Sequence, residues 1–103
     1  MSDEMAFHAI MQDERALERD RALVAFLRVQ IAERVPAAED AERGLLAAVE
    51  RVLGEFSANF EHAARCRQDE PLAQHTGALG WSLRCTAFAA FSEHPDFRMD
   101  FRP

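Results

Sequence analysis

The chain has 103 residues, a formal net charge of −6 and a hydrophobic content of 49%. This length fits one domain, residues 1–103, and the apolar content argues against a chain that is disordered throughout. All 12 basic residues are arginines, against 18 acidic residues, which disfavours a general phosphate-binding surface. No apolar run approaches the ~20 residues that span a bilayer, and the two cysteines form no disulfide framework, so we expect a cytoplasmic protein.

The first predicted helix covers residues 3–34, a stretch without glycine or proline, with Ser2 as its N-cap. Its apolar residues recur every seven positions, as in a coiled coil. The members of this stripe are Ile10, Leu17, Val24 and Ile31.

The middle of this helix, residues 12–21, is mostly charged and offers only Ala16 and Leu17 for burial. A helix of about 30 residues would be ~45 Å long, which exceeds the dimensions of a compact chain of this size. The helix should therefore either bend near this charged segment or project at its N-terminal end and pack on something else, and we favour the projection.

Pro36 ends the first helix, and a cleaner amphipathic pattern predicts a second helix over about residues 38–65. Gly44 and Gly54 indicate either the close approach of another helix or a break before the stripe begins. The stripe consists of Leu45, Leu46, Val49, Val52, Leu53, Phe56, Phe60 and Ala63.

Asp69 and Pro71 predict the start of a third helix that runs to about Ser92. The sequence His94-Pro95-Asp96 ends it and leaves a tail over residues 93–103. The predicted fold is an all-α, three-helix, mainly antiparallel bundle, which we expect to form a homodimer through the long first helix.

Two apolar groups are the predicted partner-binding residues. The N-terminal group is separated from the rest of its helix by charge, and self-association is its favoured interpretation, with a foreign protein partner as the alternative. The tail group is expected to fold back onto the bundle, with partner contact as its second interpretation. The residues are Met5, Phe7, Ile10 and Met11 in the first group, and Phe97 and Phe101 in the second.

A metal-binding protein is one alternative function. His62 and Cys66 have the i, i+4 spacing of metal ligands, and His75 and Cys85 on the next helix could complete four ligands. Ten residues at 100° each place His75 and Cys85 about 80° apart around their helix, which argues against the set. We therefore predict no metal and no cofactor.

Enzymatic and DNA-directed functions are also disfavoured. Both cysteines lie in or beside apolar helical faces, where thiols are usually inert, and dispersed acids and arginines are typical of a solvated surface. The predicted third helix has only Arg84 as an interior base, too few for a recognition helix. A DNA mimic is disfavoured because arginines interrupt the negative charge.

The tail residues 91–103, with the sequence FSEHPDFRMDFRP, resemble the ending of a family of short uncharacterised actinobacterial and actinophage proteins. Members of that family typically close with His-Pro-Asp, an aromatic residue and then Trp-Arg-Pro. Residues 23–28 and 45–50 are similar to the family's opening and middle helices, whereas Phe101 replaces the usual Trp and Ala90 the usual Pro. The resemblance implies that residues 1–19 are an added N-terminal extension. The family has no assigned reaction, so the resemblance implies an actinobacterial or phage origin but no mechanism. The alanine- and arginine-rich composition, typical of a high-GC genome, agrees with it.

Taken alone, the sequence predicts a small non-enzymatic protein that acts through helix-surface contacts. Metal binding and DNA binding or mimicry remain the alternatives.

Overall fold

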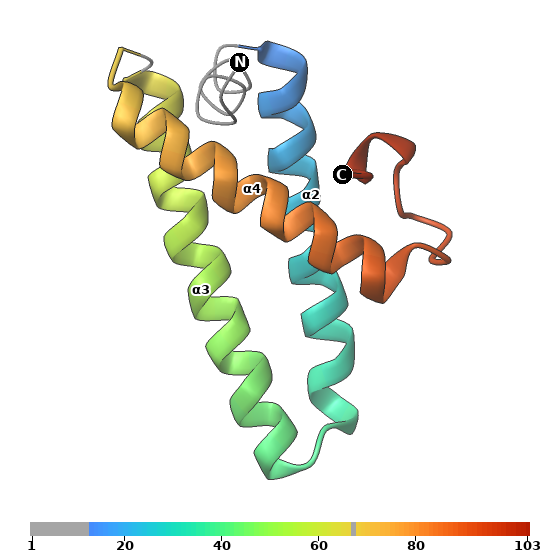
Figure 1. The fold of residues 1–103 in the computed structure, drawn as a ribbon. Helices are drawn as coiled ribbons and strands as arrows, with labels where there is room; N and C mark the ends of the chain where they lie inside the picture. The colour runs from blue at the N-terminus through green and yellow to red at the C-terminus, as the bar shows by residue number, and fades with distance from the viewer. Residues whose placement is uncertain (1–12, 67) are drawn as a thin grey trace.

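A computed structural model describes residues 13–66 and 68–103, which form three α-helices (Figure 1). The predicted all-α three-helix bundle is confirmed. None of the described helices is long and apolar enough to cross a membrane. The elements are α2 (Glu14–Arg34), a 3-10 turn (Val35–Ala37), α3 (Asp40–Arg65), α4 (Glu70–Phe91) and a second 3-10 turn (Met99–Phe101).

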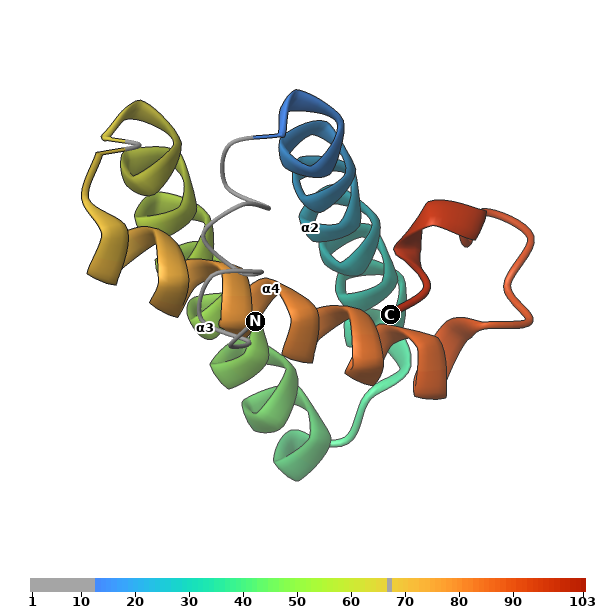
Figure 2. The ribbon, with the colours of Figure 1, turned by 45° about the horizontal axis from the view of Figure 1, so that its top comes forward.

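Helices α2 and α3 form an antiparallel hairpin, and α4 crosses it diagonally (Figures 1 and 2). Pro36 lies in the turn between the first two helices, as the sequence predicted. The Asp69 carboxylate accepts a hydrogen bond from the Leu72 N–H and caps α4, with Pro71 in the first turn. The predicted bounds of the second and third helices agree with the structure to within two residues.

Helix α2 begins at Glu14, inside the first predicted helix. Asp13 has an extended backbone, with φ −98° and ψ 115°, and its carboxylate accepts a hydrogen bond from the Arg15 N–H. The expectation of one continuous helix over residues 3–34 is therefore wrong at Asp13, whereas the charged segment after it is helical. An aspartate followed by Glu14 suits the start of a helix, because it satisfies a free N–H and faces the positive helix end. The part of the predicted extension before Asp13 lies outside the described residues.

Two apolar clusters hold the helices together. One lies where all three helices meet, and the other joins α2 and α4 to the C-terminal tail. The buried members of the first are Leu17, Val24, Phe56, Phe60, Ala63 and Ala73, and those of the second are Leu23, Phe26, Ala87 and Phe101.

A buried ion pair joins α2 to α4. Asp20 is 2% exposed, although it belongs to the segment that the sequence marked as charged and solvated. Its Oδ1 accepts hydrogen bonds from Arg84 Nη1 at 3.2 Å and from Arg19 Nε at 3.0 Å. Burial, and then the nearby charge of Arg19, lower the pKa of Arg84. Arg84 Nε and Arg19 Nη2 are buried without a hydrogen-bond partner among the described residues, so the two guanidinium groups offer more donors than this cluster has acceptors.

The close approach of α4 to this pair occurs at Gly80. A Cβ atom there would lie 3.1 Å from Asp20 Oδ2 and 3.7 Å from Phe56 Cζ. At Gly44, by contrast, a Cβ would meet nothing within 4 Å, and α3 continues through that residue. Neither a close approach nor a break therefore explains Gly44, and that expectation was wrong.

Replacing Arg84 by alanine is expected to lower the free energy of unfolding by about 3 kcal/mol, because Asp20 would remain buried with Arg19 as its remaining partner. Urea denaturation followed by circular dichroism measures the change. The control is Arg51→Ala, which removes an exposed pair with Glu55 at 3.5 Å and should cost no more than about 0.5 kcal/mol. Equal losses in the two variants would contradict a central role for the buried pair.

Two glycine substitutions should change stability in opposite directions. Gly44→Ala is expected to raise the free energy of unfolding by about 0.5–1 kcal/mol, because alanine loses less conformational entropy in a helix. Gly80→Ala should lower it by about 1–3 kcal/mol, because the added methyl group crowds the Asp20 carboxylate. Urea midpoints of the two variants test this, and a stabilising Gly80→Ala would refute the close approach.

Candidate functional site

The predicted partner-binding residues divide into two groups. The N-terminal group, Met5, Phe7, Ile10 and Met11, lies outside the described residues. The tail group lies beside α2 (Figure 1), so the predicted folding back of the tail is confirmed. The Phe101 side chain is 1% exposed and contributes to the core.

Phe26 of α2 is the aromatic residue that holds the tail. Its ring centroid lies 5.3 Å from that of His94 and 5.8 Å from that of Phe101. Phe91 and Phe97 present their edges to it at 5.7 and 6.0 Å. Such edge-to-face pairs stabilise beyond the area they bury. In this conformation Phe101 is not available to a partner, whereas Phe97 remains partly exposed.

Arg98 fastens the same tail through charge. Its guanidinium donates two hydrogen bonds to the Glu18 carboxylate, at 2.9 and 3.0 Å, and two to Asp100, at 2.9 and 2.6 Å. The hydrogen bond from Arg98 lowers the pKa of Glu18, and the bonds to both carboxylates raise the pKa of Arg98. A similar bidentate pair joins α2 to α3, where hydrogen bonding from Arg21 lowers the pKa of Glu61.

The alternative metal set is not assembled. Within residues 13–66 and 68–103, no group of three or more His, Cys, Asp or Glu residues is placed to hold a metal ion. His62, Cys66 and His75 are exposed, and Cys85 is partly buried.

The apolar stripe of α3 is only half covered. Its C-terminal half lies under α4, where Leu53 and Phe56 are 1% and 6% exposed. In its N-terminal half, Leu45, Val49 and Val52 are 69%, 49% and 59% exposed. Both halves belong to one face, because these residues follow i, i+3, i+4 spacing. We call the uncovered half, together with the groove beside it, the open face.

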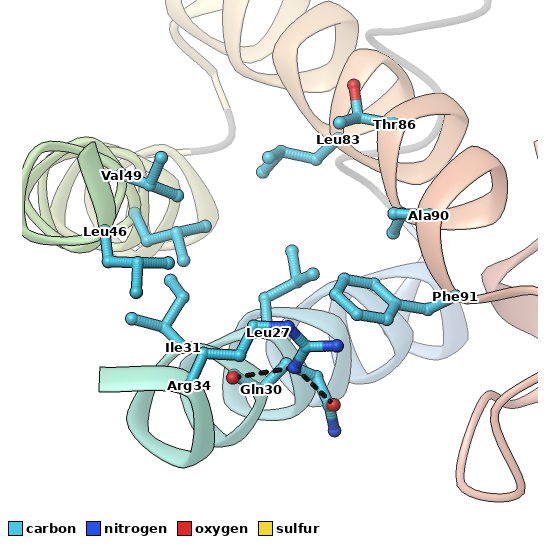
Figure 3. A pocket seen from close by; sticks show the side chains of 12 residues that line it. Leu27, Gln30, Ile31, Arg34, Leu46, Val49, Leu83, Thr86, Ala90 and Phe91 are labelled. Carbon is cyan, nitrogen blue, oxygen red and sulfur yellow. Dashed lines mark hydrogen bonds between the residues drawn. The ribbon is translucent and has the colours of Figure 1, made fainter. Parts of the chain in front are cut away.

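The groove of the open face is a cavity of about 210 Å³ between the three helices (Figure 3). An engineered protein cavity of about 150 Å³ holds benzene, whereas ordinary small-molecule sites measure roughly 300–1,000 Å³. The groove therefore has room for one large apolar side chain and is small for a cofactor. Its apolar walls include Leu27 and Ile31 from α2, Leu46 and Val49 from α3, and Leu83 and Ala90 from α4.

Polar groups stand at the border of this groove. Arg34 Nη1 donates hydrogen bonds to the Gln30 carbonyl oxygen at 2.9 Å and to Gln30 Oε1 at 3.2 Å (Figure 3). The Arg34 guanidinium also lies over the Phe91 ring, 4.9 Å from its centroid. The Arg28–Glu50 ion pair, with Arg28 Nε 3.3 Å from Glu50 Oε1, lies outside the groove, on the other side of the hairpin. An apolar floor with a polar border is the usual composition of a protein-binding surface.

Sequence reasoning identified the residues of the open face but assigned them to the core. The sequence feature that could have revealed the open face is the length of the stripe, which extends from Phe60 back to Leu45 along most of α3. Comparisons with protein-family models, curated proteins and solved structures found no match to this chain.

Acidification is expected to weaken the attachment of the tail. Because the pKa of Glu18 is lowered from 4.5 in the folded protein, its contribution to stability is present above that pH and is lost as the pH falls through the folded pKa. Glu18→Gln removes this contribution at every pH, so its stability should depend less on pH below 4.5 than that of the wild type.

Urea midpoints measured at low salt between about pH 6 and pH 3 give this dependence. Glu93→Gln, a change at an exposed carboxylate in the same tail, is the control. If the urea midpoints of the wild type and of Glu18→Gln change equally with pH, the contact between Arg98 and Glu18 does not stabilise the folded protein.

Proposed function

We propose that this chain is a small non-enzymatic interaction protein of an actinobacterium or its phage, and that it acts through helix-surface contact. The observation that supports this most is the open face, where Leu45, Val49 and Val52 remain exposed on the stripe that α4 covers elsewhere. Burying such a side chain is worth roughly 1.5–3 kcal/mol. A contiguous apolar face left uncovered on a folded domain is a common mark of an interaction site.

The mechanism would be the burial of apolar side chains from a partner in the groove. A helix is the natural partner, because the groove runs beside an exposed helical stripe and helices bind such surfaces through residues at i, i+3 and i+4. Arg34 at the border would set the orientation of the partner. The N-terminal group around Phe7 stays a second proposed contact.

The family resemblance of the tail supports the proposed actinobacterial or phage source. The residues that carry the family resemblance, among them His94 and Phe97, surround Phe26 and fold the chain end onto α2. His94 Nδ1 also accepts a hydrogen bond from the Asp96 N–H at 3.1 Å, which shapes the turn at the start of the tail. The motif therefore has a structural use in this chain, and its resemblance bears on origin rather than on a shared partner.

A photocrosslinking residue at position 49 should form covalent adducts in cells that produce the protein, because the proposed contact buries Val49. The matched control is position 29, since Val29 is also exposed, 52% against 49%, but lies about 160° around α2 from Ile31, which lines the groove. Adducts are expected at position 49 and not at position 29. Absence of any adduct at position 49 would contradict the proposed function.

A further inference from the structure

Arg34 is the only charged residue that lines the groove of the open face. The other polar side chains of its lining are Gln30 and Thr86, and both already have partners in the chain. Gln30 Oε1 accepts a hydrogen bond from Arg34, and Thr86 Oγ1 donates one to the Ser82 carbonyl oxygen at 3.0 Å. A ligand in this groove would therefore meet apolar walls and a single cation.

The Arg34 guanidinium is held in place and still has one free edge. Its Nη1 is bonded to Gln30, and its centre lies 4.9 Å from the centroid of the Phe91 ring. Among the described residues, Nε and Nη2 of Arg34 take part in no hydrogen bond or ion pair. In Figure 3 these two nitrogens lie on the side turned towards Leu27 and Phe91, which both line the groove.

The free edge of Arg34 matches a carboxylate. The Nε and Nη2 groups of a guanidinium donate two parallel hydrogen bonds, one to each oxygen of a carboxylate. The chain itself contains this geometry, because Arg21 Nε and Nη2 donate to the two carboxylate oxygens of Glu61 at 2.6 and 3.2 Å. One guanidinium also balances one negative charge, so the charge and the geometry both favour a monocarboxylate.

The volume of the groove sets the size of the apolar part of the ligand. A protein cavity of about 150 Å³ holds benzene, which has six carbons, so about 210 Å³ has room for ~8 carbons. All three helices supply apolar walls for such a body, with Leu27 from α2, Leu46 from α3 and Leu83 from α4.

We propose that this groove is a binding site for a small carboxylic acid whose apolar body has about eight carbons. The carboxylate binds the Nε–Nη2 edge of Arg34, and the apolar body lies between the three helices. The site goes beyond the proposed protein contact, because Leu45 and Val52 do not line the groove and stay exposed when it is filled.

Isothermal titration calorimetry of the full chain with octanoate tests the site. Octanoate is expected to bind with a 1:1 stoichiometry and at least tenfold more tightly than octylammonium, which has the same apolar body and the opposite charge. Arg34→Gln should weaken octanoate binding at least tenfold and leave the affinity for 1-octanol unchanged, because 1-octanol has no charge for Arg34 to bind. The matched control is Arg102→Gln, since Arg102 also stacks on a phenylalanine ring, Phe88, at 5.6 Å but does not line the groove.

A second pair of variants tests the place of the apolar body. Ala90 lines the groove and is exposed, so Ala90→Leu should fill the groove and abolish octanoate binding. Ala89→Leu adds the same side chain at an exposed neighbour that does not line the groove, and it should leave binding unchanged. Circular dichroism checks that all four variants fold.

Absence of saturable octanoate binding at concentrations up to 10 times about 1 mM, the affinity expected for so small a ligand, would overturn the proposal. Equal affinities for octanoate and octylammonium would also overturn it, as would equal effects of Arg34→Gln and Arg102→Gln. These results leave the crosslinking at position 49 untouched, so the ligand site can fail while the proposed function stands.

Discussion

The position of α4 depends on the buried contact between Asp20 and Arg84. A carboxylate on the inner side of α2 is costly to bury, and Arg84 lies within hydrogen-bond distance at 3.2 Å. Gly80 lies one turn before Arg84 and lets the backbone of α4 approach the same carboxylate. These two contacts hold the middle of α4 against Asp20, where α4 crosses α2 diagonally (Figure 1).

The open face is a consequence of that crossing. A third helix lying along the hairpin would cover the α3 stripe from end to end, as in a regular bundle. Because α4 is fixed near Asp20, it covers Phe56 but leaves Leu45 and Val49 exposed. One polar contact in the core thus determines which apolar residues of α3 remain exposed.

Sequence patterns predicted which residues share a face but not what covers that face. The α3 stripe has the same spacing in its buried and exposed halves, so periodicity alone cannot separate Leu53 from Val49. The burial of Asp20 could not be predicted either, because Asp20 lies among charged residues and its partner is 64 positions away along the chain. Arg84, weighed in the sequence as an isolated base for DNA contact, is that partner. The helix ends were easier to predict, since Asp69 and Pro71 form local capping signals that need no tertiary contact.

The tail and the open face are coupled through one side chain. Phe91 lines the groove and also contacts Phe26 in the aromatic cluster of the tail. Arg34 stacks on the same ring from the border of the groove. A groove whose walls are already fixed costs less conformational entropy to fill than one that must be ordered by its partner. The tail that Arg98 and Phe26 hold in place therefore helps to keep the Phe91 wall of the groove in position.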